Sequence, residues 1–257
     1  MAIHPTAIVD PKAAIASDAE IGPYCIIGPG VTIGARTRFM AHAYLEGKLT
    51  IGEDNIFYPY CSCGVAPQDK KYRGEASETR IGNGNTIREF VTINRGTEGG
   101  GMVTAIGNGN LLMAYVHVAH DVIVHDRTIL ANGVTFAGHV IVEDGANLGG
   151  MTAVHQFCRI GCYAIVGSFS VIKKNVLPYS ITAAPHEVEV YGANRVGMER
   201  AGFSNESIEA LQNAFRILTR AGLNTTQALA RIDEEVPATA EVRHLLEFIK
   251  AGQKTTA

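Results

Sequence analysis

Aliphatic residues and phenylalanine return at every sixth position along most of this chain. The first run consists of Ile3, Val9, Ile15, Ile21, Ile27, Ile33, Phe39, Leu45, Ile51 and Phe57. The pattern resumes at Ile81, Ile87 and Ile93, and after a slip of one residue it runs from Ile106 to Ile172. Two residues before these positions the side chain is usually small or β-branched, and a glycine often follows them. A six-residue period fits neither an α-helix nor the two-residue alternation of a half-buried strand.

A hexapeptide repeat predicts a parallel β-helix, in which each unit is one short strand and a corner. Three units close a triangular coil. The periodic aliphatic side chain fills the interior, the small residue packs beside it, and the glycine supports the turn. Residues eighteen apart then lie one above another in successive coils, about 4.8 Å apart. An offset in the sequence therefore predicts a distance in space wherever no loop intervenes.

Two segments interrupt the repeat and are expected to leave the β-helix as excursion loops. The first, residues 63–80, is polar and eighteen residues long, so we expect the repeat to resume in phase at Ile81. The second, near residues 96–105, is rich in glycine and is expected to be mobile. Long loops on a rigid scaffold commonly carry function, and a tolerated insertion is the alternative. The charged residues Asp69, Lys70 and Lys71 favour function.

The repeat ends near Pro178, and from about residue 187 the apolar pattern becomes helical. Ser204 is placed to cap the start of a helix that Gly222 ends. Two further helices are expected, because apolar residues recur at helical spacing in both segments. These segments are 226–235 and 240–250.

We therefore predict a mainly β protein of two domains. Residues 1–186 form the β-helix, and residues 187–257 form an α-helical C-terminal domain that covers its open end. Solenoids of this kind expose flat faces and commonly associate side by side under closed symmetry.

Charge and hydropathy exclude several classes of protein. The net charge is −3, so no basic field indicates nucleic-acid binding. No apolar run approaches the roughly 18 residues that a membrane-spanning helix needs. Pro5, Asp10 and Pro11 stand where a signal peptide would need its apolar core. We expect a cytoplasmic protein with no membrane span.

The five cysteines are irregularly spaced. Cys25, Cys61 and Cys158 all fall on the small position of the repeat, where a buried thiol behaves as a small hydrophobic residue. Packing is favoured over zinc binding for them. Disulfides are not expected in this compartment.

The histidines point to a site for chemistry. Four of the nine fall within 39 residues, namely His117, His120, His139 and His155. The eighteen-residue rule stacks one column made of His120, Gly138 and Gln156. The neighbouring column is made of Asp121, His139 and Phe157. The repeat itself requires none of these residue types, so one edge of the prism gathers a cluster with a functional purpose.

Proton transfer is the chemistry that this cluster suits. A neutral imidazole makes a general base near neutral pH, and Asp121 is a candidate for holding such a ring. Gly138 leaves a backbone N–H exposed, as the stabilisation of an oxyanion requires. No serine or cysteine is obviously paired with a histidine, so direct transfer is favoured over a covalent enzyme intermediate.

Two other interpretations of the cluster remain. The histidines at the corners can be satisfied by backbone carbonyls. A zinc site with His117, His120 and His139 as ligands is the second alternative. Asp121 and Gln156 stand where such a site would use histidine, so we expect no metal and no cofactor.

Four motifs carry a resemblance to a known family. They are AHD at 119–121, AGHV at 137–140, GGMTAVHQF at 149–157 and QDKKY at 68–72. Together they make the chain similar to the acyl-carrier-protein:UDP-N-acetylglucosamine O-acyltransferases, which begin lipid A biosynthesis. The resemblance covers essentially the whole chain. The repeat alone is shared by many acyltransferases, whereas AHD combined with GGMTAVHQF is specific.

The resemblance implies a left-handed β-helix, an exception to the usual handedness of crossovers. It also implies a homotrimer with active sites between subunits, and acyl carrier protein and UDP-N-acetylglucosamine as partners. His120 matches the base that deprotonates the glucosamine 3-hydroxyl for attack on the acyl thioester. Asp121 matches the residue that supports this base, and Gly138 matches the glycine whose amide faces the oxyanion.

The same match gives the substrate-contacting positions, namely Asp69, Lys71, His117, His139, His155, Gln156 and Arg200. Lys71 and Arg200 suit phosphate groups. Basic residues for contact with the acidic carrier protein, or for an ordinary solvated surface, are Lys173, Lys174, Arg195, Arg216 and Arg220.

Three residues depart from the family pattern. Asn94 stands where many relatives have histidine, which leaves a 3-hydroxyl or a 3-amino sugar acceptor open. Ala201 follows Arg200 where a second arginine is frequent. Ser168 holds the position that limits acyl-chain length, where glycine is common, so the preferred length stays open.

Three other functions are known for related β-helices or are compatible with this repeat. The later N-acyltransferase of the same pathway carries a domain before its β-helix, for which the early start of the repeat leaves no room. A metal-dependent β-helix trimer of the carbonic anhydrase kind and a non-catalytic scaffold are the other two. The stacked histidine column argues against a scaffold.

Overall fold

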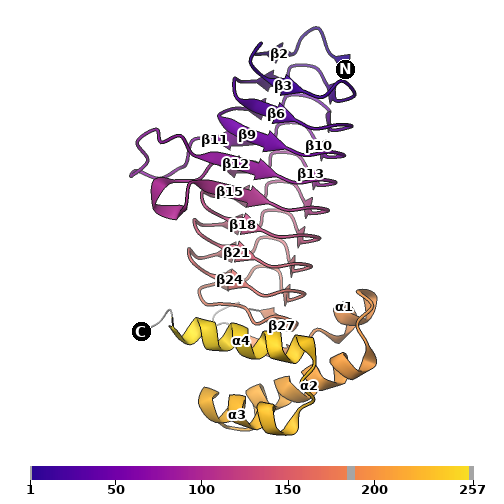
Figure 1. The fold of residues 1–257 in the computed structure, drawn as a ribbon, viewed down its shortest axis with the longest axis vertical. Helices are drawn as coiled ribbons and strands as arrows, with labels where there is room; N and C mark the ends of the chain where they lie inside the picture. Colours follow the sequence, from indigo (N-terminus) through magenta and orange to yellow (C-terminus); the bar gives the residue numbers. More distant parts are fainter. Residues whose placement is uncertain (1, 184–188, 255–257) are drawn as a thin grey trace.

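The computed structural model describes residues 2–183 and 189–254. The molecule is elongated, with a stack of β-coils that begins at the N-terminus and a group of helices at the other end (Figure 1). Two loops project from one side of the stack, about midway along it (Figure 1).

The described strands form three sheets, one for each side of the triangular prism. The first sheet contains β1 (Ala2–Ile3), β4 (Glu20–Ile21), β7 (Arg38–Phe39), β10 (Ile56–Phe57), β13 (Thr86–Ile87), β16 (Leu111–Leu112), β19 (Ile129–Leu130), β22 (Asn147–Leu148), β25 (Ile165–Val166), β27 (Ser180–Ala183) and β28 (Glu189–Ala193). The second contains β2 (Ile8–Val9), β5 (Ile26–Ile27), β8 (Tyr44–Leu45), β11 (Ser62–Val65), β14 (Thr92–Asn94), β17 (His117–Val118), β20 (Thr135–Phe136), β23 (Ala153–Val154) and β26 (Val171–Ile172). The third contains β3 (Ala14–Ile15), β6 (Val31–Ile33), β9 (Lys48–Ile51), β12 (Glu78–Ile81), β15 (Val103–Ile106), β18 (Ile123–Val124), β21 (Ile141–Val142) and β24 (Arg159–Ile160).

The pairing register confirms the eighteen-residue rule. Val118 pairs with Phe136, and Phe136 pairs in turn with Val154. The periodic aliphatic side chains point inward and form a single cluster along the stack. Ile3 is the exception and is 38 % exposed, because it lies in the first coil and no coil covers it.

The insertions differ in length from the expectation. Ile51 pairs with Ile81, thirty residues on rather than eighteen, so the first loop adds twelve residues and not eighteen. β11 and β12 take up both ends of the segment predicted as loop, which leaves 66–77 as the excursion. Ile81 pairs with Ile106, twenty-five residues on, so the second loop adds seven residues and produces the one-residue slip.

The glycines that follow the aliphatic positions serve a purpose other than the predicted one. Gly22 and Gly34 do not have positive φ angles; a Cβ atom on Gly22 would lie 1.9 Å from the carbonyl oxygen of Met40. Close approach of the next coil therefore requires glycine there. The corners themselves place larger residues in the left-handed region, such as Tyr24 (φ 57°) and Tyr60 (φ 68°).

Buried asparagines connect the coils through a hydrogen-bonded column. The side-chain amide of Asn55 donates to the carbonyl of Gly82 at 2.8 Å. Asn85 donates both its backbone N–H and its side-chain amide to Asn55 Oδ1, at 2.9 Å each. The N–H of Asn110 donates to Asn85 Oδ1 at 2.8 Å. Each side chain satisfies backbone groups that the turn would otherwise leave unpaired.

The C-terminal part confirms three predicted helices and adds two elements. Its helices are α1 (Arg195–Arg200), α2 (Asn205–Arg220), α3 (Thr225–Glu235) and α4 (Ala240–Lys254). Ser204 caps α2 by accepting a hydrogen bond from the N–H of Ser207, as predicted. The prediction that helical structure begins at about residue 187 was wrong, because the strand β28 comes first and pairs antiparallel with β27. The predicted boundary at 186–187 lies outside the described residues.

The helices pack around a second hydrophobic core that includes Met198, Leu211, Phe215 and Leu245. This core reaches Tyr179 at the last coil, so the helices cover the end of the β-helix as predicted. No helix in the described ranges is long and apolar enough to cross a membrane.

Replacing Asn85 with alanine should lower the free energy of unfolding by about 1–3 kcal/mol, because it removes the bonds to Asn55 and Gly107 and leaves buried groups unpaired. Denaturant unfolding measures the loss. Asn108→Ala is the matched control, since Asn108 bonds between coils on the exposed surface and should cost far less. Equal losses in the two variants would contradict the role of the buried column.

Candidate active site

The predicted columns meet at the edge between the second and third sheets. The backbone shows the stacking directly: the N–H of His139 donates to the carbonyl of His120 at 3.1 Å, and Phe157 N–H donates to Gly138 at 3.2 Å. A groove of about 440 Å³ runs along this edge, and its walls include His117, His120, Gly138 and His155. The loop between β11 and β12 reaches the groove through Gln68.

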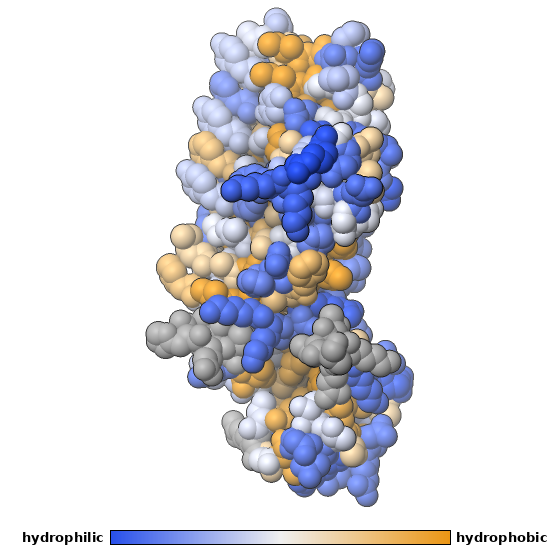
Figure 2. Space-filling view, turned by 90° about the vertical axis from the view of Figure 1, so that its left-hand side faces the viewer, coloured by the Kyte–Doolittle hydropathy of each residue, from blue (hydrophilic) through white to orange (hydrophobic). Residues whose placement is uncertain are grey.

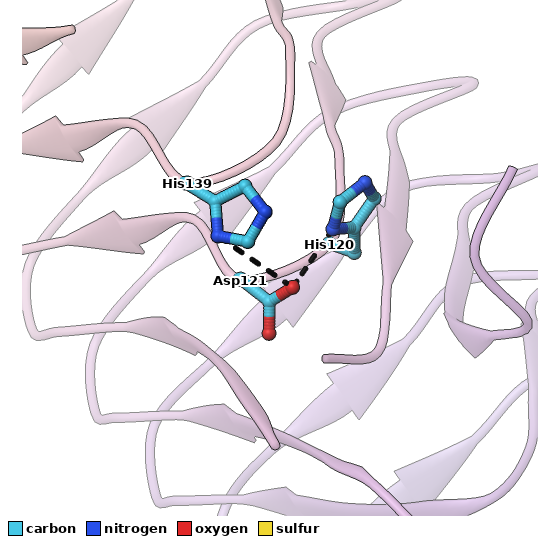
Figure 3. A group of neighbouring side chains, drawn as sticks. All are labelled: His120, Asp121 and His139. Atoms are coloured by element: carbon cyan, nitrogen blue, oxygen red, sulfur yellow. Dashed lines mark hydrogen bonds and ion pairs between the residues drawn. The ribbon is translucent and has the colours of Figure 1, made fainter. Parts of the chain in front are cut away.

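His120 and Asp121 form the centre of the site (Figure 3). His120 Nδ1 and Asp121 Oδ2 lie 2.8 Å apart, and the Asp121 side chain is fully buried while that of His120 is 16 % exposed. Asp121 occupies the corner with φ of 60°, which turns its carboxylate back under the imidazole. The arrangement fixes the ring and leaves its other nitrogen toward the groove.

Thr97 holds the carboxylate of Asp121, a role that the sequence did not reveal. The Thr97 N–H donates to Oδ1 at 2.8 Å, and its hydroxyl donates to Oδ2 at 2.5 Å. Gly100 packs so closely that a Cβ atom there would lie 1.9 Å from the carboxylate carbon. The second loop, which we expected to be mobile, therefore forms a 3₁₀ turn at Glu98–Gly100 that encloses Asp121.

Gly138 is required by the ring of His120. A Cβ atom on Gly138 would lie 2.5 Å from His120 Cε1 and 2.8 Å from Nε2. The Gly138 N–H donates to no acceptor within the described residues. Gly138 lines the groove beside the imidazole, but it is buried rather than exposed as the sequence predicted.

His139 lies next to the His120–Asp121 pair but is not hydrogen-bonded to Asp121. Its ring stacks on Phe157 with centroids 4.5 Å apart and meets the ring of His120 edge-on at 5.1 Å. His139 Nδ1 is 3.9 Å from Asp121 Oδ2 (Figure 3). Burial lowers the pKa of His139, and the charges of Asp69 and Lys71 from the first loop also act on it.

His117 and Asn94 form the wall of the groove on the adjoining sheet. His117 Nδ1 lies 2.7 Å from the Thr92 hydroxyl, and burial lowers the pKa of this histidine. Asn94 is buried and donates to the carbonyl of Ala66 at 3.2 Å. Its side-chain oxygen is buried and has no hydrogen-bond partner among the described residues, although Asn94 itself lines the groove.

Six of the predicted substrate and chain-length residues are not among those that line this groove, namely Asp69, Lys71, His139, Gln156, Ser168 and Arg200. Arg200 ends α1 in the helical part, and Ser168 is exposed at a different corner of the prism, next to Phe169. Gln156 is exposed beside His155 at the groove. Lys173 also lines the groove, which supports its candidacy for contact with a carrier protein.

The side chains at this edge that could bind a metal ion differ from the three zinc ligands that the sequence suggested. His120, Asp121 and His139 bring one ligand atom each within 4.8 Å of one another, and His117 is not part of the group. Thr97, which is not a member of this group, donates to both oxygens of the Asp121 carboxylate at 2.8 and 2.5 Å. The geometry therefore suits a histidine base held by an aspartate better than a metal centre.

The side of the molecule that carries the loops is chemically mixed. Figure 2 faces this side and shows strongly hydrophilic side chains at the height of the loops, with hydrophobic side chains exposed closer to the helices. Phe157, in the same column as Asp121 and His139, is one of the exposed large hydrophobic residues. Such a surface indicates a contact with another molecule.

A stack of hexapeptide coils with a held histidine in a groove defines a hexapeptide-repeat transferase. A family model of bacterial transferase hexapeptides matches residues 2–35 and 104–138, and a model of UDP-N-acetylglucosamine O-acyltransferase domain 2 matches 175–256. An acyl-[acyl-carrier-protein]–UDP-N-acetylglucosamine O-acyltransferase of Thermodesulfovibrio yellowstonii is 47 % identical over 98 % of this chain and 97 % of its own length. The corresponding protein of Thiobacillus denitrificans is 48 % identical with the same coverage.

Solved structures agree with these relatives. The UDP-N-acetylglucosamine acyltransferase of Bacteroides fragilis matches with a TM-score of 0.94 at 41 % identity and covers 96 % of both chains. That of Moraxella catarrhalis matches with a TM-score of 0.93 at 43 % identity, covering 98 % of this chain and 97 % of its own. The chain belongs to the UDP-N-acetylglucosamine O-acyltransferase family. The predicted left-handed β-helix, helical C-terminal part and acyltransferase class are confirmed.

Replacing Gly100 with alanine should reduce acyl transfer by about a hundredfold, because the methyl group displaces Asp121 and the histidine that it holds. Initial rates with acyl carrier protein and UDP-N-acetylglucosamine measure the loss. Gly99→Ala is the matched control, since a Cβ atom there meets nothing within 4 Å. A Gly100→Ala enzyme of full activity would show that the loop does not position Asp121.

Proposed function

We propose that this enzyme transfers a 3-hydroxyacyl chain from acyl carrier protein to the 3-hydroxyl of UDP-N-acetylglucosamine, the first step of lipid A biosynthesis. The observation that carries the proposal is the His120–Asp121 pair, which faces a groove in a chain of this family. The names of the relatives support both substrates.

His120 acts as the general base. With Nδ1 donating to Asp121, Nε2 has a free lone pair that accepts the proton of the sugar hydroxyl. Asp121 keeps the ring in this tautomer and stabilises the imidazolium that forms. Because the bonds from Thr97 orient the carboxylate, the base is in position before substrate binds.

The sugar oxygen then attacks the thioester carbonyl directly. The carbonyl oxygen gains negative charge in the tetrahedral intermediate, and the free N–H of Gly138 donates to it. The carbon–sulfur bond breaks, and the imidazolium returns its proton to the departing thiolate. Within the described residues no cysteine or serine is bonded to His120, which favours direct transfer.

The sugar nucleotide and the acyl chain require contacts on both sides of the base. We assign the sugar nucleotide to Asp69, Lys71, His117, His139, His155 and Gln156, with Arg200 on a phosphate. Lys71 and Arg200 provide positive charges for the diphosphate. Ser168 limits the acyl chain.

A homotrimer explains why Ser168 and Arg200 lie away from the groove. Ser168 shares a prism corner with an exposed apolar row that includes Tyr115, Met151 and Phe169, the last being 73 % exposed. In a cyclic trimer this row of one subunit packs against the groove of the next and is removed from water. The neighbouring subunit then supplies Ser168 and Arg200.

A 3-amino analogue of the same sugar is the second candidate acceptor, because Asn94, which lines the groove, departs from the histidine of the family pattern. The two acceptors therefore belong in one assay.

Replacing His120 with alanine should reduce acyl transfer by about 10²–10⁴-fold, as expected for the loss of a general base. The assay uses UDP-N-acetylglucosamine, its 3-amino analogue and a panel of 3-hydroxyacyl carrier proteins. His125→Ala is the control, because His125 lies at the opposite side of the third sheet, away from the groove. Full activity in His120→Ala would remove the base from the mechanism, and activity of the wild type with neither acceptor would sink the proposed reaction.

Shared active sites predict complementation between inactive variants. Co-expressed His120→Ala and Arg200→Ala chains should recover about a quarter of wild-type activity, because random mixing in a cyclic trimer restores that fraction of intact sites. Co-expressed His120→Ala and Asp121→Ala chains, which are both damaged in the same half-site, should recover none. Complementation absent from the first pair would indicate that each site is built by one chain.

A further inference from the structure

A second cluster of ligand-type side chains lies between the β-helix and helix α4. Figure 1 shows α4 crossing the end of the stack near β24. Glu143 follows β21, Cys162 lies in the turn after β24, and His244 projects from the first half of α4. Their ligand atoms all lie within 4.8 Å of one another.

Glu143 is the centre of this cluster. Its Oε2 lies 3.0 Å from His244 Nε2 and accepts the backbone N–H of Cys162 at 2.8 Å. Its side chain is only 9 % exposed. A cavity of about 390 Å³, which is lined by all three residues and by Tyr179, adjoins the cluster and provides room for a water ligand.

Arg159 organises the carboxylate without occupying the same oxygen. Its guanidinium pairs with Glu143 Oε1, and Phe248 of α4 lies under the guanidinium at 4.9 Å. Oε2 is therefore presented toward His244 and Cys162. An outer partner that orients a carboxylate in this way is typical of metal sites.

We infer that Glu143, Cys162 and His244 bind one zinc ion, with a water molecule from the cavity as fourth ligand. One thiolate, one imidazole and one carboxylate suit zinc, whereas magnesium and calcium prefer oxygen alone. Ligands of tetrahedral zinc stand about 2.0–2.3 Å from the metal, so the three side chains draw in slightly around it. The ion would join α4 to the β-helix, and it departs from the expectation that the chain binds no metal.

Protons compete with the ion for these ligands. Zinc binds the thiolate of a cysteine and the neutral imidazole of a histidine, so binding releases protons and affinity rises with pH. The site is chemically separate from the groove of His120, and acyl transfer does not depend on it directly.

Cobalt(II) is the probe, because a cysteine ligand gives a thiolate-to-cobalt band that a site of histidine and carboxylate cannot give. The full-length protein, stripped with a chelator, is titrated with cobalt at pH 8. We expect one equivalent per chain, a charge-transfer band in the near ultraviolet and the visible bands of tetrahedral cobalt. Zinc should displace the cobalt and abolish these bands.

Variants test the ligands one at a time. Cys162→Ser should lose the charge-transfer band, and His244→Gln should weaken cobalt binding by about tenfold or more. Two controls should keep the spectrum: Cys158→Ala, a buried cysteine outside the cluster, and His125→Gln, which lines the same cavity. Circular dichroism establishes that each variant is folded.

Three results would overturn the proposal. The first is that folded wild-type protein binds no cobalt. The second is a thiolate band that persists in Cys162→Ser. The third is cobalt bound without a thiolate band and lost in His120→Ala, which would place the metal in the groove instead.

Discussion

The width of the prism interior is the constraint on which the rest of this structure depends. Each side of a coil has room for one large aliphatic side chain, so the chain must turn every six residues. Because every coil has the same perimeter, the backbones stack in register and place residues eighteen apart in contact. A rigid frame of this kind positions polar side chains at its edges without any of them entering the core.

The candidate active site is built where that frame is interrupted. The stacked coils supply His120 and Gly138 at adjacent levels, and the second loop folds back to close on Asp121 through Thr97. The frame alone would leave the carboxylate facing solvent at a corner, where it could not orient an imidazole. The insertion therefore provides the burial that the repeat cannot provide.

The features of the fold and of the site that follow from the six-residue repeat could be predicted from the sequence. The stacking of His120 on Gly138 and of Asp121 on His139 came from an offset of eighteen, and the helix cap at Ser204 came from local chemistry. The hydrogen bonds between Thr97 and Asp121 could not be predicted, because Thr97 lies in a loop outside the repeat, where an offset in the sequence does not give a distance. Cys162 and His244 are brought together across 82 residues by the docking of α4, which sequence spacing does not encode. The positions of the glycines were predicted correctly, but the reason given for them was wrong. Glycine is required there because the backbone of the next coil leaves no room for a Cβ atom.

The antiparallel pairing of β28 with β27 has a consequence for solubility. A stack of parallel strands ends in a row of unpaired backbone groups, which is a template for adding further strands from other molecules. β28 reverses direction at that edge of the first sheet, and four of its five residues pair with β27 in an irregular register. A parallel strand from a second molecule cannot continue the pattern beyond it, so the first sheet is protected against fibrous growth at the end that bears the helices.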